Sequence, residues 1–86
     1  MPPGEWRVHT SRQVLDRWAE RASYSPHRLV AYWEWVVART LDGPPEEAIR
    51  VFGEDELMLV DLPGTPLVVS FFAVVQDRMI IVKEIT

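Results

Sequence analysis

The chain contains no cysteine, so it can form neither a disulfide bond nor a thiolate zinc site. It also has no apolar run that approaches the roughly 20 residues needed for a membrane-spanning helix. Its first residues, MPPGEWRVH, lack the apolar segment of a secretory signal peptide. These absences predict a soluble cytoplasmic protein that does not associate with a membrane.

An excess of basic charge is also absent. Nine Lys and Arg stand against thirteen Asp and Glu, which gives a formal net charge of −4. Residues 1–43 contribute +1 from six Arg and five acids, and residues 44–86 contribute −5 from three basic residues and eight acids. Nucleic-acid binders usually carry a basic surface because phosphate contacts supply much of their affinity. RNA binding by this chain would therefore require a local basic patch.

The 86 residues suit one domain, 1–86, and 48% of them are hydrophobic, which is enough to form a core. The sequence contains no calcium-binding acidic loop, no glycine-rich phosphate loop and no nucleophile elbow. The acids around residues 46–61 include no recognisable ligand set, and we predict neither a metal nor a cofactor.

The C-terminal third consists of three apolar runs rich in β-branched and aromatic residues, at 57–62, 67–75 and 79–85. The turn-forming sequence PGTP at 63–66 separates the first two, and Gln76-Asp77 separates the last two. Such residues favour strands joined by tight turns. The segment predicts a three-stranded antiparallel meander.

The first half of the chain predicts one strand and two helices. Residues 5–9 alternate between apolar and polar side chains, which is typical of a short strand. Thr10 or Ser11 can cap a helix of about three turns, in which Val14 and Trp18 recur at helical spacing. Ser25 and Pro26 are typical of a second helix start, and that helix is predicted to run to about residue 40.

After the break at 42–45, residues 46–52 favour a further short helix with acids in its first turn. The predicted domain is therefore α+β: an N-terminal strand, two helices, a short helix and the meander, with the helices on one sheet face. Spacing alone leaves open whether the N-terminal strand lies at an edge or in the middle of the sheet.

The second predicted helix carries two stripes of large side chains. We expect one to face the core; it comprises Val30, Trp33, Val37 and Leu41, flanked by Leu29 and Val36. The opposite stripe comprises Arg28, Tyr32, Trp35 and Arg39. Guanidinium and aromatic groups on one exposed face are typical of a binding hot spot, for protein or for RNA bases. In the alternative interpretation, Tyr32 and Trp35 pack inward and the two arginines extend over them.

Two stretches combine strand and helix patterns in a distinctive order. They are the opening EWRVHTSRQVLDRW, and ELMLVDL followed by PLVVSFFAVVQDRMIIVKEI. The first resembles the first strand and helix of the RelE/ParE toxin superfamily, which includes HigB and phage-derived relatives. The second resembles that superfamily's C-terminal strands. The resemblance spans nearly the whole chain and implies a toxin-like component of a toxin–antitoxin system.

The resemblance implies one of two activities: cleavage of ribosome-bound mRNA without a metal, or action on DNA gyrase. In the ribonucleases, Arg and Lys orient phosphate, and a Tyr or His transfers protons. The corresponding catalytic candidates in this chain are Arg7, His9 and Arg78. The alternative role of Arg7 and His9 is that of solvated polar residues, and that of Arg78 is surface ion pairing. An antitoxin or a host target would be the protein partner, with RNA or the ribosome as a further possibility.

The chain departs from the family pattern where phosphate-handling residues are expected. Residues 67–69, LVV, stand where the family usually has an arginine, and acids at 54–56 stand where it has lysines. These departures favour an alternative function on the same fold: a non-catalytic module that binds a protein through the stripe of Arg28, Tyr32, Trp35 and Arg39, or through an open sheet edge.

Overall fold

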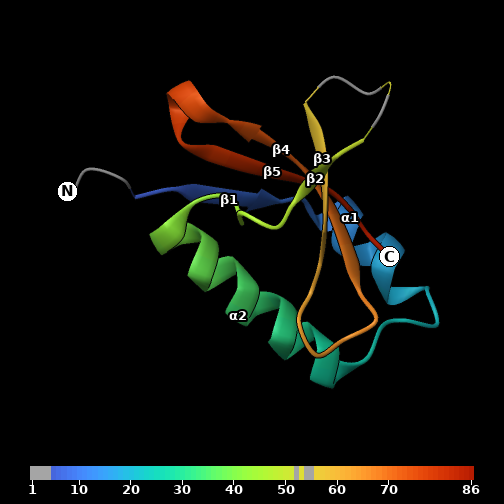
Figure 1. The fold of residues 1–86 in the computed structure, drawn as a ribbon. Coiled ribbons are helices and arrows are strands. Elements are labelled where there is room, and N and C mark those ends of the chain that lie inside the picture. Colours follow the sequence, from blue (N-terminus) through green and yellow to red (C-terminus); the bar gives the residue numbers. More distant parts are fainter. Residues whose placement is uncertain (1–4, 52, 54–55) are drawn as a thin grey trace.

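The computed structural model describes residues 5–51, 53 and 56–86, which form an α+β fold with two helices and a five-stranded mixed sheet (Figure 1). The predicted α+β class is therefore confirmed. The elements in chain order are β1 (Arg7–Thr10), α1 (Arg12–Ala19), α2 (Pro26–Asp42), β2 (Ile49–Arg50), β3 (Leu57–Asp61), β4 (Val68–Val74), the 3₁₀ turn η1 (Val75–Asp77) and β5 (Met79–Ile85).

The strand order is β1-β5-β4-β3-β2, so the predicted three-stranded meander is wrong as a description of the sheet. The three predicted strands pair antiparallel in sequence order, but β2 and β1 extend the sheet on its two sides. β1 is an edge strand and lies parallel to β5, with Arg7 opposite Met79 and Thr10 opposite Val82. An unpaired β5 would leave a row of backbone N–H and C=O groups open, and β1 satisfies them.

The short helix predicted at 46–52 is also wrong. Ile49 and Arg50 form β2 instead, opposite Leu59 and Met58 of β3. The N–H of Val51 continues this pairing by donating to the carbonyl of Leu57 at 2.9 Å. A seven-residue helix is marginal in isolation, whereas the edge of β3 offers backbone partners directly. Phe52, the last residue of the predicted helix, lies outside the described residues.

Both predicted helix caps are formed by serine. The backbone N–H of Val14 donates to Ser11 Oγ at 3.2 Å, and that of Arg28 donates to Ser25 Oγ at 3.1 Å. α1 is shorter than predicted because it ends at Ala19, and α2 continues to Asp42. Gly43 ends α2 with φ 77° and ψ −159°, a backbone conformation that is almost restricted to glycine.

The helices cover one face of the sheet, and Figure 1 shows α2 running along it, below the strands in this view. Aromatic side chains connect the layers: Trp18 meets Tyr32 edge to face, Tyr32 stacks with Trp35, and Trp35 contacts Phe71 of β4. All four are in the core. Offset and edge-to-face aromatic pairs contribute beyond the area that they bury.

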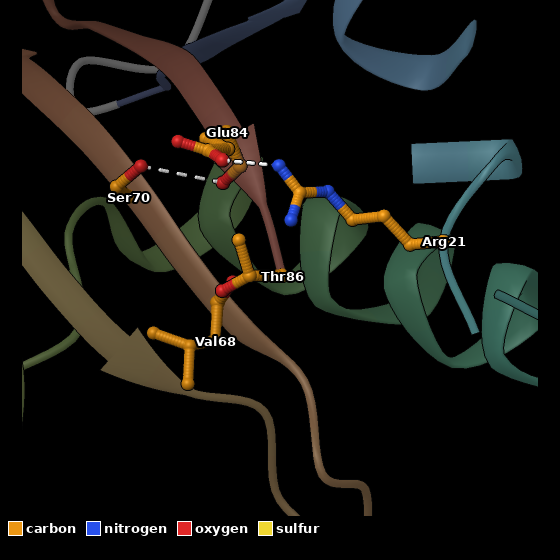
Figure 2. Close-up of polar contacts among 5 residues, drawn as sticks. All are labelled: Arg21, Val68, Ser70, Glu84 and Thr86. Carbon is orange, nitrogen blue, oxygen red and sulfur yellow. Dashed lines mark hydrogen bonds and ion pairs between the residues drawn. The ribbon is translucent and has the colours of Figure 1, made fainter. Parts of the chain in front are cut away.

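The last residues of the chain are tied to β4 and to the segment after α1 (Figure 2). Arg21 pairs with the carboxylate of Glu84 on β5, and Ser70 Oγ donates to the Glu84 carbonyl at 3.4 Å. The N–H of Thr86 donates to the carbonyl of Val68 at 2.8 Å. A register shift between Ser70 and Phe71 lies within this region. These contacts join the segment after α1 to β4 and β5 at one end of the sheet.

The predicted core face of α2 is wrong, because α2 has the opposite orientation. Tyr32 and Trp35, placed on the exposed face by sequence, are buried, and the four residues predicted to be in the core are exposed. The physical reason is area: an aromatic ring buries about 150–250 Å², more than a valine side chain offers. Burial of Tyr32 and Trp35 therefore stabilises the folded state more than burial of Val30 and Val37 would.

Candidate protein-binding surface

The solvent side of α2 carries an apolar stripe, which we name the outer stripe. It comprises Val30, Trp33, Val37 and Leu41, whose exposed fractions are 58%, 42%, 59% and 72%. Their spacing of three, four and four residues places them in one row along the helix. Isolated exposed apolar residues are ordinary on a protein surface, but a continuous row is a candidate site of interaction.

The outer stripe lies on a helix whose opposite face is held to the rest of the fold by several contacts. The Tyr32 hydroxyl shares a hydrogen bond with the hydroxyl of Thr10 on β1, with 2.5 Å between the oxygens. Trp35 packs on Phe71, and the N–H of Trp6 donates to the carbonyl of Thr40 at 2.9 Å. A partner would therefore meet a preformed surface and would lose little conformational entropy in ordering it.

Burial also makes the phenol of Tyr32 harder to ionise. Loss of hydration raises the pKa of this phenol to about 12, against a smaller lowering effect of the hydrogen bond with Thr10. Tyr32 is thus a neutral core residue at physiological pH, where it has a structural role.

The two arginines of the predicted binding stripe each contact a group outside the outer stripe. Arg28 donates from Nη1 to the carbonyl of Ser23 at 2.9 Å. The Arg39 guanidinium lies 5.9 Å from the Trp35 ring centroid, and its Nε is buried. The exposed stripe predicted from Arg28, Tyr32, Trp35 and Arg39 is therefore wrong as a surface, and its alternative, inward packing beneath the arginines, describes the arrangement.

A groove lies beside the N-terminal half of the outer stripe, with a volume of about 530 Å³. α2 provides one wall with His27, Arg28, Val30, Ala31 and Glu34, and the loop 63–66 between β3 and β4 provides the other. Ala31 is small, which leaves room between the helix and the loop. The groove would admit a side chain from a partner that lies along α2.

The structure places all three predicted catalytic residues on the surface near one sheet edge. Arg7 and His9 are exposed and share one face of β1, since they are two residues apart. The N–H of Arg7 donates to the carbonyl of Arg78 at 2.9 Å. Arg78 is exposed and adopts a left-handed backbone, with φ 49°, at the start of β5. Their catalytic role stays a prediction.

In residues 5–51, 53 and 56–86, no three His, Asp or Glu side chains gather closely enough to hold a metal ion. No helix formed by those residues is both long and apolar enough to cross a membrane.

Comparison of the chain with models of protein families, with curated proteins and with solved structures found no match. The resemblance to the RelE/ParE superfamily therefore stays a prediction.

The outer stripe was missed as a surface because its residues are the apolar type expected in a core. The signal that could have found it is the competing pair Tyr32 and Trp35, whose larger side chains favour the buried side of the same helix.

Proposed function

We propose that the protein is a non-catalytic interaction module that binds another protein through the outer stripe of α2. The supporting observation is the exposure of Trp33 and its three aliphatic neighbours on a helix that is anchored by its other face. Tryptophan is enriched at the energetic centres of protein interfaces. An apolar helix ridge is also the element that helix-in-groove recognition uses.

The test compares capture of a partner by three forms of the full chain. The first is the unmodified protein, and the second is the double variant Trp33→Ala/Leu41→Ala. The third is Ile49→Ala, which removes an apolar side chain of similar exposure (64%) on β2, away from α2. The expected result is that the unmodified protein and Ile49→Ala capture the same partner, while the double variant loses it.

The captured protein is then purified and titrated against all three forms. We expect the double variant to bind about 100-fold more weakly, since central aromatic residues contribute 2 kcal/mol or more. Circular dichroism and thermal unfolding serve to establish that the double variant is folded. Equal affinity of the folded double variant and the unmodified protein would contradict the proposal.

A second function has its own support: the toxin-like activity implied by the RelE/ParE resemblance. The observation in its favour is that Arg7, His9 and Arg78 are all exposed near the β1 edge, two of them linked through their backbones. A toxin component should arrest growth on induction and be relieved by an antitoxin. A ribonuclease should cleave ribosome-bound mRNA, with loss of cleavage in Arg7→Ala or His9→Ala. A gyrase poison should inhibit supercoiling instead. Harmless expression without either effect contradicts this candidate.

A further inference from the structure

A second hollow, of about 360 Å³, lies at a place in the fold separate from the outer stripe. Its described lining residues belong to β2, β3, β4, η1 and the loops before β2 and β3, and they include no residue of α2. Segments that are far apart in the sequence therefore meet there. The volume is within the range that small-molecule sites occupy. This hollow is a second candidate site, and it does not depend on the proposed function.

Much of the surface of this hollow is apolar. Met58 of β3 and Ala73 of β4 are half-buried and pack against the core. Pro44, Val74 and Val75 add further apolar surface, and Val75 is 67% exposed. Transfer of apolar area out of water is favourable, so a ligand with an apolar group gains free energy by covering these side chains.

Both signs of charge are present in the hollow. Arg50 lies on β2 opposite Met58 of β3, and Glu56 lies two residues before Met58. Both charged side chains are exposed, and no ion pair joins them. The remaining polar side chain among the described lining residues is the neutral amide of Gln76. Glu56 has a φ of 63°, in the left-handed region that residues other than glycine seldom adopt, and such residues cluster at ligand-binding sites.

The two charges determine which ligand suits the hollow. A ligand with one negative charge is attracted by Arg50 but repelled by Glu56, and a ligand with one positive charge meets the reverse. A zwitterion gains from both groups, through a charge-assisted hydrogen bond with each. Ion pairs between exposed side chains contribute little to stability, so a ligand that keeps Arg50 and Glu56 apart loses little by doing so.

We propose that the hollow binds a free α-amino acid with an apolar side chain. Its carboxylate accepts hydrogen bonds from the Arg50 guanidinium, its ammonium group donates to the Glu56 carboxylate, and its side chain covers Met58 and Val75. An α-amino acid carries these three groups on one carbon atom, and the hollow presents the complement of each within one small volume. The end of a polypeptide carries only one of the two charges, so it satisfies half of this site.

The experiment titrates the isotopically labelled full chain with L-leucine and follows the backbone amide signals by NMR. We expect the signals of Arg50, Met58 and Ala73 to shift and to saturate. Three related compounds separate the contacts: N-acetyl-L-leucine lacks the ammonium charge, L-leucinamide lacks the carboxylate, and glycine lacks the side chain. Each is expected to bind about tenfold more weakly than L-leucine, because each loses one of the three contacts.

Two variants assign these preferences to the proposed contacts. Arg50→Gln is expected to bind L-leucine and L-leucinamide equally, because the group that recognises the carboxylate is gone. Glu56→Gln is expected to bind L-leucine and N-acetyl-L-leucine equally, for the corresponding reason. Arg17→Gln and Glu20→Gln are the matched controls, since they remove the same charges at exposed positions at the end of α1. Both controls should keep the preferences of the unmodified chain.

Three results would overturn the inference. If N-acetyl-L-leucine binds as tightly as L-leucine, the hollow recognises carboxylates in general, and equal binding of L-leucinamide would identify a site for amines. If the shifts caused by L-leucine do not saturate, or occur away from Arg50 and Met58, the hollow is not an amino-acid site. None of these results concerns the outer stripe, which is tested separately by partner capture.

Discussion

The two faces of α2 are both apolar, yet one is buried and the other is open to solvent. The inner face presents Tyr32 and Trp35 to α1 and the sheet, where they join a row of aromatic contacts that ends at Phe71. The outer stripe has Trp33 and three aliphatic residues, with more than two fifths of each side chain exposed. Apolar residues at helical spacing therefore identify an apolar helix face, but they do not show whether that face is buried in the core.

The positions of charged residues also do not predict which face of α2 is buried. The inner face carries Arg28 and Arg39, while the outer side carries Glu34. Arginine tolerates the inner position because its long stem lies on apolar neighbours and its guanidinium can stack on an aromatic ring, as that of Arg39 does over Trp35. The inner face is therefore a structural surface and the outer stripe a surface available for binding.

The difference between the two faces of α2 is tested most directly by removing one tryptophan from each face. Trp35→Ala is expected to reduce the free energy of unfolding by about 3–5 kcal/mol, because it leaves a cavity against Phe71 and Tyr32. Trp33→Ala should cost about 1 kcal/mol or less, since much of that ring is exposed. Urea denaturation measures both. Equal losses would show that the two faces are not energetically distinct.

Burial of Tyr32 on the inner face should also make the stability of the fold depend on pH in the alkaline range. The pKa of Tyr32 is raised to about 12, above that of an unfolded tyrosine, so its contribution to stability is complete below pH 10 and is lost as pH rises towards 12. This loss amounts to about 2–3 kcal/mol.

The measurement is the difference in unfolding free energy between the unmodified chain and Tyr32→Phe across that pH range. Tyr32→Phe itself costs about 1 kcal/mol at neutral pH because it removes the hydrogen bond with Thr10. Above pH 10 the difference should shrink and then reverse. Tyr24→Phe is the control, and a constant difference for Tyr32→Phe would contradict the burial of the phenol.

The end of α2 provides a test of how the helix is positioned. Gly43→Ala should destabilise the fold by about 2 kcal/mol, since alanine disfavours this backbone. A Cβ atom there would also lie 2.7 Å from Nε1 of Trp6. Gly64→Ala is the matched control: its φ is 75° but no atom lies within 4 Å of the added Cβ, so about 1 kcal/mol is expected. Thermal unfolding ranks the two, and equal losses would exclude a steric role for Trp6.

The smallest effect on stability is expected on the outer stripe. Val37→Ser/Leu41→Ser should change the free energy of unfolding by about 0.5 kcal/mol per site or less, because both side chains are already more than half exposed. The same variant should lose partner binding and gain solubility, since it shortens the exposed apolar row. A loss of stability comparable with that of Trp35→Ala would show that the stripe is part of the core.

Local signals predicted much of this fold. The strand at 79–85 is confirmed with both ends, and Ser11 and Ser25 cap the helices, because alternation and capping depend on neighbouring residues. β2 was missed because a two-residue strand is defined by its pairing with β3, here with Leu59 and Met58, and not by its own sequence. The parallel partner of β1 depends on the path of the chain through both helices, which periodicity does not record.

The sequence predicted a binding surface on the face of α2 that the structure buries. Both rows of α2 satisfy helical spacing, so the choice depended on which row had more area to bury in contact with α1 and the sheet. That contact area is a tertiary property. Arg28 and Arg39 suggested exposure, but both are half-buried, because they contact the Ser23 carbonyl and the Trp35 ring.

The parallel pairing of β1 with β5 joins residues 7–10 to residues 79–82, so it constrains the order of events during synthesis. While the ribosome is still translating the intervening seventy or so residues, β1 has no strand to pair with. α1 and α2 can form early, but Trp18, Tyr32 and Trp35 stay without their sheet. The sheet that covers the inner face of α2 is therefore incomplete until β5 has been made, and only the outer stripe remains exposed afterwards.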